Sequence, residues 1–241
     1  MIVLKNQVAV VTGASSGIGK AIALALAAQG AKLCLLGRKL DQLLAVQKSA
    51  EETSPQVICY QLDLTLDEDI EKLKARLDVD FGHVDILIHS AGVIALGDIQ
   101  TASVANFDWQ YRTNVRTPYL LTQTLLPDLI SSQGQIVFIN SSAGLNAKAG
   151  VGQYAATKHA LKAIADSLRS EVNALGVRVI SVFPGRTASP MQAAICEMEG
   201  KAYNSSRFLQ PEDVAAVVIN ALSLPHTAEV TDIHVRPFQK S

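Results

Sequence analysis

The sequence predicts an α/β fold in which one parallel sheet carries helices on both faces. Short runs rich in Val, Ile and Leu recur along the 241 residues, and segments of helical length separate them. Nearly every position in these runs is apolar, as a strand covered on both faces requires. These two observations predict a doubly wound sheet of seven strands, whose ligands bind beyond the carboxyl ends of the strands.

Seven runs are predicted strands, at residues 8–11, 32–36, 57–61, 86–89, 135–140, 177–183 and 231–235. Six segments between them are predicted helices, at residues 17–29, 40–52, 66–80, 104–131, 151–175 and 211–222. Gly30 is typical of the residue that follows a helix, and Pro211 of the residue that begins one. Because no linker or repeat interrupts this order, residues 1–241 are expected to form a single domain, with the irregular segment 188–210 as a substrate loop.

Composition and charge argue against several classes of function. The 21 basic and 22 acidic residues give a net charge of -1 without long runs of one sign, so neither nucleic acid nor a membrane surface is an expected partner. Cys34, Cys59 and Cys196 form no CxxC pair, which argues against a disulfide framework or a metal site. The apolar run at 8–11 is too short for a signal peptide, and no run reaches the ~18 apolar residues of a membrane span. A cytoplasmic protein that binds small molecules is expected.

A glycine-rich turn directly follows the first predicted strand and begins the first helix: Thr12-Gly13-Ala14-Ser15-Ser16-Gly17-Ile18-Gly19. Glycines in such a turn let the backbone approach a pyrophosphate, whose charge faces the free N–H groups at the start of the helix. A tight turn without a ligand is the alternative, because the spacing differs from GxGxxG. The residues of this candidate dinucleotide site are Gly13, Ser15, Ser16, Gly17, Ile18 and Gly19.

A tyrosine and a lysine four residues apart, Tyr154 and Lys158, begin a long predicted helix and so share one face of it. Reduction of a carbonyl needs a proton donor at the oxygen. A phenol with a pKa near ~10 exchanges its proton poorly at neutral pH unless a nearby ammonium stabilises the phenolate. Ser141 lies just beyond the fifth predicted strand, where the ligand crevice is expected. Ser142 competes with it, but the SxxG spacing to Gly144 favours Ser141.

With these motifs the chain resembles the short-chain dehydrogenase/reductase family, from the TGxxxGIG turn to the YxxxK pair. The resemblance covers about residues 8–235 and implies a Rossmann-type fold, an oxidoreductase, and a homo-oligomer that is either a tetramer or a dimer. It implies that Tyr154 is the general acid/base, that Ser141 hydrogen-bonds the substrate oxygen, and that Asn114 holds a proton-relay water. Lys158 would hold the nicotinamide ribose and lower the pKa of Tyr154.

The resemblance also assigns cofactor contacts at the ends of the later strands. Asp63 would hydrogen-bond the adenine, and the Thr187 backbone and the Ser189 hydroxyl would contact the nicotinamide carboxamide. The family usually has Asn-Asn where this chain has His89 and Ser90, and His89 is interpreted as a structural residue, as a single His at a strand end usually is. The full set of these contacts is Asp63, Leu64, Ala91, Gly92, Tyr154, Lys158, Pro184, Gly185, Thr187 and Ser189.

The cofactor is expected to be NADP(H) rather than NAD(H). NAD-specific folds of this kind place a carboxylate at the end of the second strand for the ribose 2'-hydroxyl, and here that position is Gly37. Arg38 beside it can bind a 2'-phosphate with its planar donor fork. The alternative is that Arg38 simply points into solvent at the start of the second helix.

The predicted activity is hydride transfer between NADP(H) and a ketone, aldehyde or oxoacid, or the reverse oxidation of an alcohol. The C-terminal stretch 231–237 resembles NADP-dependent 3-hydroxy acid or short-chain alcohol dehydrogenase members, and a 3-oxoacyl-thioester reductase is the alternative enzyme. A catalytically silent nicotinamide-binding sensor or scaffold is the alternative from another class, although it would not need Ser141, Tyr154 and Lys158 together. Candidate specificity residues in the substrate loop are Met191, Met198, Tyr203 and Phe208.

Overall fold

A computed structural model of the chain describes residues 4–238, in which seven strands form one parallel sheet. The strand order is β3-β2-β1-β4-β5-β6-β7. The chain winds outward from β1 in both directions, so the order reverses between β1 and β4, where doubly wound sheets bind their ligands. The strands are β1 (Val8–Thr12), β2 (Lys32–Gly37), β3 (Val57–Gln61), β4 (Ile86–His89), β5 (Gln135–Ile139), β6 (Arg178–Pro184) and β7 (Asp232–Val235).

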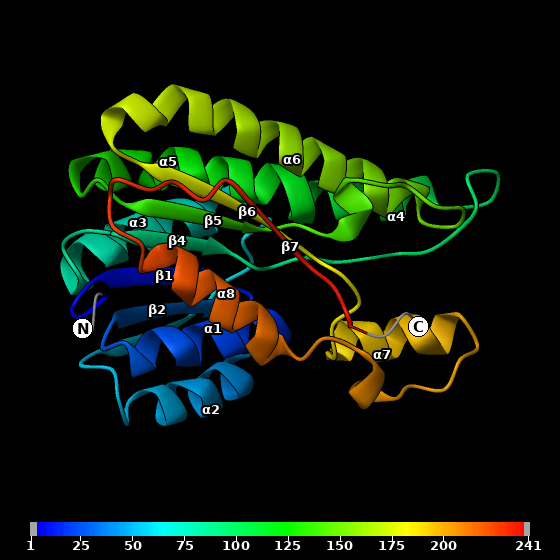
Figure 1. Cartoon of the computed structure of the whole chain (residues 1–241), viewed down its shortest axis with the longest axis horizontal. Helices are drawn as coiled ribbons and strands as arrows, with labels where there is room; N and C mark the ends of the chain where they lie inside the picture. Colours follow the sequence, from blue (N-terminus) through cyan, green and yellow to red (C-terminus); the bar gives the residue numbers. More distant parts are fainter. Residues whose placement is uncertain (1–3, 239–241) are drawn as a thin grey trace.

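Helices cover both faces of the sheet, as the sequence predicts (Figure 1). One face packs against α1 (Gly17–Ala28), α2 (Leu40–Ala50) and α8 (Pro211–Leu222), and the other against α3 (Asp67–Asp80), α5 (Thr117–Ser131) and α6 (Gly152–Val172). All five residues of β1 are buried, and because alternate side chains of a strand point to opposite faces, its four apolar residues divide between the two cores. This two-sided burial explains why the strands are apolar at nearly every position.

The predicted helix 104–131 is interrupted by a π-helical turn at Arg112–Arg116, which separates α4 (Val104–Tyr111) from α5. The prediction of one uninterrupted α-helix is therefore wrong, although the segment remains helical throughout. A π turn is less favourable than an α turn and occurs mostly at functional sites. Here it contains Asn114, whose buried side chain bonds the backbone that follows β4.

Part of the segment expected to be an irregular loop forms a further helix, α7 (Pro190–Met198). Its start has favourable residues: the Ser189 hydroxyl accepts a hydrogen bond from the Gln192 N–H, and Pro190 occupies the first helical position. Beyond α7 the chain returns to the sheet, where Leu209 pairs with Thr187. α7 consequently lies beyond the carboxyl ends of the strands, at the right of Figure 1.

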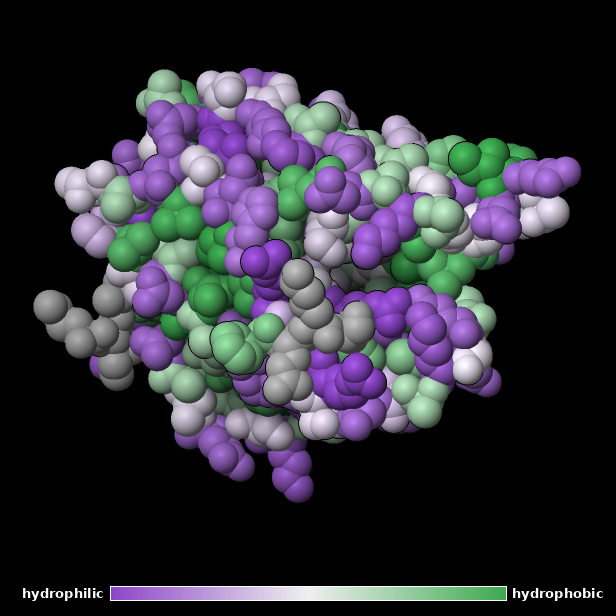
Figure 2. All heavy atoms as spheres, turned by 45° about the vertical axis from the view of Figure 1, so that its right-hand side comes forward, coloured by the Kyte–Doolittle hydropathy of each residue, from purple (hydrophilic) through white to green (hydrophobic). Residues whose placement is uncertain are grey.

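Two predicted helix boundaries are confirmed. Gly30 follows α1 with a φ of 71°, in the left-handed region that glycine adopts without strain. Pro211 begins α8, and the Asp213 carboxylate accepts a hydrogen bond from the Gln210 N–H in a capping box. On the side of the molecule that is turned forward in Figure 2, hydrophilic and hydrophobic residues are mixed, in keeping with the even distribution of charge along the sequence.

Candidate active site

A cavity of about 1030 Å³ lies at the carboxyl ends of the strands. This volume is at the upper end of the range for ligand sites, about 300–1,000 Å³, and fits a large ligand. Of the predicted catalytic and cofactor-binding residues only Asn114 does not line the cavity; it lies behind the wall. Those that do are Gly13, Ser15, Ser16, Gly17, Ile18, Gly19, Arg38, Asp63, Leu64, Ala91, Gly92, Ser141, Tyr154, Lys158, Pro184, Gly185, Thr187 and Ser189.

The glycine-rich turn leaves room only for backbone atoms. A Cβ on Gly19 would lie 2.4 Å from the Gly13 carbonyl oxygen, and a Cβ on Gly13 would lie 2.9 Å from the Ala91 Cα. Gly13 and Gly17 also have positive φ values, 66° and 54°. The N-terminus of α1 has neither a side-chain cap nor an acidic residue in its first turn. Its free N–H groups and positive end therefore fit a pyrophosphate.

The ends of β2 and β3 contribute the charged residues Arg38 and Asp63. Arg38 is exposed, and within residues 4–238 its guanidinium forms no ion pair, which leaves its donors free for a phosphate. The Asp63 carboxylate accepts hydrogen bonds from the N–H and the hydroxyl of Thr65, at 3.0 and 2.8 Å. This local turn fixes the carboxylate in the wall of the cavity.

The turn after β4 is held against β1 by Thr12. Its Oγ1 accepts hydrogen bonds from the N–H groups of Ser90 and Ala91, both at 3.0 Å. His89 lies on the other side of this turn, where its Nε2 is 2.8 Å from Thr122 Oγ1 and its ring stacks on Phe138. Burial lowers the pKa of His89 to about 3. His89 is therefore a neutral structural residue, as expected from the sequence.

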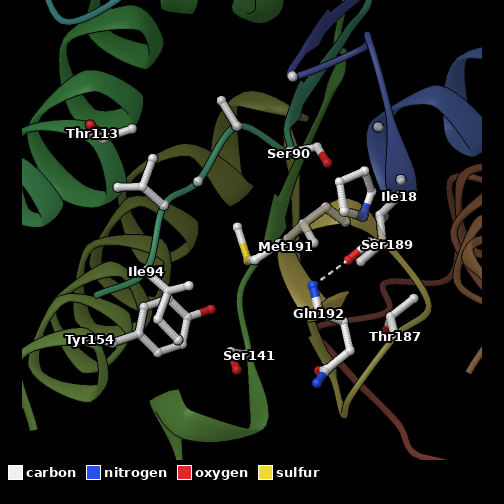
Figure 3. Close-up of a pocket in the computed structure, with 18 of the residues that line it drawn as sticks. Ile18, Ser90, Ile94, Thr113, Ser141, Tyr154, Thr187, Ser189, Met191 and Gln192 are labelled. Atoms are coloured by element: carbon white, nitrogen blue, oxygen red, sulfur yellow. Dashed lines mark hydrogen bonds between the residues drawn. The ribbon is translucent and has the colours of Figure 1, made fainter. Parts of the chain in front are cut away.

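Three of the four predicted catalytic residues, Tyr154, Ser141 and Lys158, converge in the cavity. Tyr154 and Ser141 lie close to each other in Figure 3, and the tyrosine is within hydrogen-bonding reach of the serine hydroxyl. Lys158 is only 4% exposed, and its Nζ donates a hydrogen bond to the Ile139 carbonyl oxygen at 3.1 Å. The same Nζ lies 5.8 Å from the centroid of the Tyr154 ring. A phenol, a hydroxyl and an ammonium thus share one end of the cavity.

Burial raises the pKa of Tyr154, and its hydrogen bond with Ser141 opposes this rise only in part. The expectation that Lys158 lowers the pKa of Tyr154 stays a prediction: burial of the phenol dominates the shift, and the ammonium is directed at the Ile139 carbonyl oxygen. Burial also lowers the pKa of Lys158, to about 8. The phenol keeps its proton at neutral pH, which is the form that a general acid needs.

Asn140 is a site residue that the sequence motifs do not identify. Its buried amide donates a hydrogen bond to the Lys158 carbonyl oxygen at 3.1 Å and accepts one from the Ser141 N–H at 2.9 Å. A Cβ on Gly144 would lie 2.5 Å from the Asn140 Oδ1. Asn140 therefore fixes the serine segment to the helix that carries the lysine. The signal for it in the sequence is a polar residue at the end of the apolar run 135–139.

Asn114 is 1% exposed and bonds the backbone of Val93 in both directions. Its Oδ1 accepts from the Val93 N–H, and its Nδ2 donates to the Val93 carbonyl, both at 2.9 Å. The Nδ2 also donates to Thr157 Oγ1 at 3.1 Å. Both amide hydrogens are thus used, so the side chain of Asn114 has no donor left for the water that the resemblance assigns to it.

The end of β6 joins the cavity to α7. The Ser189 hydroxyl accepts from the Gln192 N–H (dashed line in Figure 3), which leaves its own proton available for a ligand. Arg186 and Lys201 both pair with Glu199 near the C-terminal end of α7, and their hydrogen bonds hold the pKa of Glu199 below its usual value. The pair between Arg186 and Glu199 connects the end of α7 to the turn after β6, whereas the pair between Lys201 and Glu199 is local. They lie outside every motif, so sequence reasoning misses them.

The part of the cavity near Tyr154 and α7 contains apolar lining residues that the sequence identifies only in part. Of the four candidates in the substrate loop, Met191 lines the cavity, whereas Met198, Tyr203 and Phe208 do not. The Tyr203 and Phe208 rings instead stack on each other with centroids 5.7 Å apart. The additional apolar lining residues are Ile94, Leu96, Val151 and Ile195.

Neither a metal centre nor a membrane span is found among residues 4–238. Their His, Cys, Asp and Glu side chains form no group of three that could hold a metal ion. Within the same range, every helix is too short or too polar to cross a bilayer. The three cysteines are free thiols, two of them buried.

Comparisons with known proteins agree with the fold. The sequence pattern of the family described as short chain dehydrogenase matches residues 7–200. An uncharacterised oxidoreductase of Staphylococcus epidermidis is 35% identical over 236 residues, which cover 97% of this chain and 98% of the relative.

Two solved structures are similar over nearly the whole chain. One is an alcohol dehydrogenase from the archaeon Thermococcus sibiricus complexed with 5-hydroxy-NADP, with a TM-score of 0.90 and 25% identity over 98% of this chain and 99% of that one. The other is the L-sorbose reductase of Gluconobacter frateurii complexed with NADPH and L-sorbose, with a TM-score of 0.89 and 25% identity over 97% and 96%. This chain therefore belongs to the short-chain dehydrogenase/reductase family and is an oxidoreductase that acts with NAD or NADP.

Proposed function

We propose that the protein is an NADP(H)-dependent carbonyl reductase that converts a ketone, aldehyde or oxoacid to an alcohol, or catalyses the reverse oxidation. The observation that carries this proposal is the position of Tyr154 and Ser141 in the same cavity as the glycine-rich turn and Arg38. A proton donor and an anion-binding turn thus open into one space. A protein that only bound a nicotinamide cofactor would not need the first of these.

The residues of the cavity fit NADP(H). The turn from Gly13 to Gly19 excludes side chains and presents the N-terminus of α1, so it would hold the pyrophosphate. Arg38 would bind the 2'-phosphate, Asp63 the adenine, and the Thr187 backbone and the Ser189 hydroxyl the carboxamide. Further contacts would come from Leu64, Ala91, Gly92, Pro184 and Gly185. When bound, NADPH supplies the hydride for the reduction.

The proton chemistry belongs to Tyr154. The phenol is protonated at neutral pH and can donate its proton to the carbonyl oxygen as the alcohol forms, and the Lys158 ammonium, 5.8 Å from the ring centroid, would stabilise the phenolate that results. Ser141 would donate a hydrogen bond to the same oxygen and stabilise the negative charge that develops there. Lys158 has two N–H groups beyond the one directed at Ile139, which would bind the nicotinamide ribose. Asn114 acts by fixing the backbone of Val93 in the wall.

The test follows NADPH absorbance in the presence of a panel of diketones, oxoacids, aldehydes and a 3-oxoacyl thioester. Wild-type protein should consume NADPH with at least one class of these compounds. The class that is reduced decides whether the protein is instead a 3-oxoacyl-thioester reductase. Tyr154→Phe should lower kcat by about 10²- to 10⁴-fold, because it removes the proton donor, and should leave the Kd for NADPH within about threefold. Equal turnover by wild type and Tyr154→Phe would exclude the proposed role of the phenol.

We further propose that the protein is a homo-oligomer, a tetramer or a dimer. Supporting this, the segment 107–119 exposes large apolar side chains on one long helical stretch, including Trp109, Tyr111 and Tyr119 at 40%, 51% and 54%. Light scattering after size exclusion would measure the mass, and a monomer at micromolar concentration would contradict the proposal. A cytoplasmic location is part of the same proposal, and cell fractionation would test it.

A further inference from the structure

The segment after β4, residues 93–97, forms one wall of the cavity and is held from behind at alternate positions. The backbone of Val93 bonds the Asn114 side chain, the Ala95 N–H donates to the Gln110 Oε1 at 3.0 Å, and the Gly97 N–H donates to the Gly150 carbonyl at 2.8 Å. The side chains between these positions, Ile94 and Leu96, line the cavity. Backbone groups at alternate positions thus bond away from the cavity, and the side chains between them face it, as in an extended strand.

The spacing of Gln110 and Asn114 along their helical segment matches the spacing of the backbone groups that they bond in the wall. Four residues of helix rise about 6 Å, and two residues of extended chain cover about 6.6 Å. Side chains four positions apart on a helix therefore reach backbone groups two positions apart on the wall. Asn114 belongs to the family's set of four residues, but Gln110 belongs to none of the motifs. Gln110 is nevertheless 0% exposed and uses both ends of its amide.

The second contact of Gln110 connects the wall to the helix that carries Tyr154. Its Nε2 donates to the Gln153 Oε1 at 3.2 Å, and the Gln153 Nε2 donates to the Ser103 carbonyl at 2.9 Å. Gln153 directly precedes Tyr154 at the start of α6. The glutamine pair therefore fixes the distance between the wall and the segment that holds the phenol.

The wall faces apolar side chains of α7 across the cavity. Ile94 lies beside the Tyr154 ring in Figure 3, and Met191 lies opposite. Leu96 from the wall and Ile195 from α7 also line the cavity. Apolar groups thus bound the space next to Tyr154 and Ser141 on two sides, although Gln192 and Glu199 line the cavity at other positions in and next to α7.

We propose that Gln110 is a positioning residue for an apolar substrate subsite, formed by Ile94 and Leu96 on one side and Met191 and Ile195 on the other. The subsite takes the carbon chain of a carbonyl compound whose oxygen meets Tyr154 and Ser141. The preferred substrates are consequently ketones or aldehydes with an extended apolar arm. This inference rests on the proposed carbonyl reduction and adds the class of substrate to it.

The test compares kcat/KM for a series of methyl ketones from butanone to octan-2-one. In wild type, kcat/KM should rise about threefold to fourfold for each methylene that the subsite covers. Gln110→Met removes the acceptor for the Ala95 N–H at similar volume and should flatten this dependence. It should lower kcat/KM about tenfold for octan-2-one, leave butanone within about twofold, and not change the KM for NADPH.

Gln135→Met is the matched control. Gln135 is also a buried glutamine that donates to a backbone carbonyl, that of Leu222, but it lies at the amino-terminal end of β5, away from the cavity. The control should lower the Tm and leave the dependence on chain length unchanged. If both variants affect all ketones equally, Gln110 has only a structural role and the proposal is overturned.

Hydrogen exchange gives a readout that does not need activity. The Ala95 amide should exchange faster in Gln110→Met than in wild type, while exchange in Gln135→Met should match wild type there. Unchanged exchange at Ala95 would overturn the positioning role. If wild-type protein reduces no ketone, aldehyde, oxoacid or thioester, the proposed function fails, and the exchange data alone decide whether Gln110 fixes the wall.

Discussion

The Nζ of Lys158 donates a hydrogen bond to the carbonyl oxygen of Ile139, 3.1 Å away, at the carboxyl end of β5. The contact holds the ammonium in the wall of the cavity, largely removed from water. Burial disfavours the charged form, which is why the pKa of Lys158 falls to about 8. The charge of Lys158 therefore titrates within the range in which enzymes are assayed.

We expect the kcat/KM for NADPH to fall above pH 8. Lys158 is charged below its pKa of about 8 and neutral above it, so the favourable charge for the cofactor is lost as the pH rises. The slope should approach about tenfold per pH unit, as for loss of one proton. The measurement is a pH profile from 6 to 10 with NADPH as the varied substrate. Lys158→Arg keeps its charge throughout, so the same decline in this variant would contradict the assignment.

Arg38→Ala should raise the KM for NADPH about tenfold to a hundredfold and leave the KM for NADH nearly unchanged. The guanidinium lines the cavity beyond β2 and forms no ion pair within the described range of the chain, so the variant loses only its bond with the 2'-phosphate. Lys48→Ala is the control, because this lysine is exposed on α2 and does not line the cavity. An equal change for both cofactors in Arg38→Ala would show that Arg38 does not recognise the phosphate.

His89 should make folding stability depend on pH. Its pKa is about 3 in the folded protein, below the ordinary value of 6.5, so the unfolded chain takes up the proton at higher pH. The contribution is complete above pH 6.5 and is lost as the pH falls toward 3, by roughly 1.4 kcal/mol per pH unit. Between pH 6.5 and 5 this amounts to about 2 kcal/mol.

Urea unfolding at both pH values would measure this loss, which His89→Gln should reduce. The glutamine still reaches Thr122 but does not titrate. His159→Gln, at an exposed position on α6, is the control and should leave the loss as in wild type. Identical pH dependence in wild type and His89→Gln would rule out the buried imidazole as its source.

Gly19→Ala should weaken NADPH binding by about tenfold to a hundredfold. The new Cβ would meet the Gly13 carbonyl oxygen at 2.4 Å, so the turn must shift away from the geometry that presents the N–H groups of α1. Gly152→Ala is the control, since its nearest neighbour would be an Ile99 side-chain carbon at 3.5 Å. A fluorescence titration with NADPH measures the Kd of both variants. Equal affinities of Gly19→Ala and Gly152→Ala for NADPH would show that the turn tolerates a side chain and does not approach the pyrophosphate closely.

Much of the fold could be predicted because burial on both faces leaves a direct mark on the sequence. The run from Ile136 to Ile139 is apolar because helices cover it on either side, and β5 forms there. The π turn at 112–116 could not be predicted in this way. It depends on hydrogen bonds between Asn114 and Val93, which are distant in the sequence. Helix periodicity alone contains no information about that contact.

The residues of the candidate site likewise divide into those that the sequence predicts and those that it does not. Tyr154, Lys158 and Ser141 follow from spacing, because helix geometry and strand ends place them together. Gln110 could not be identified, since a buried glutamine looks the same in the sequence as an exposed one. α7 had a start signal in Ser189 and Pro190, but nine residues of mixed polarity give only a weak helical pattern.

The segment that carries α7 leaves the sheet and returns to it at adjacent points. The Ala188 N–H donates to the Leu209 carbonyl at 2.7 Å, and the Leu209 N–H donates to the Arg186 carbonyl at 3.1 Å. Residues 189–208 thus form an excursion whose two ends meet. A segment of this kind can be replaced as a unit. Replacement segments of different length and composition that keep both junctions would reshape the α7 side of the cavity without disturbing the strands.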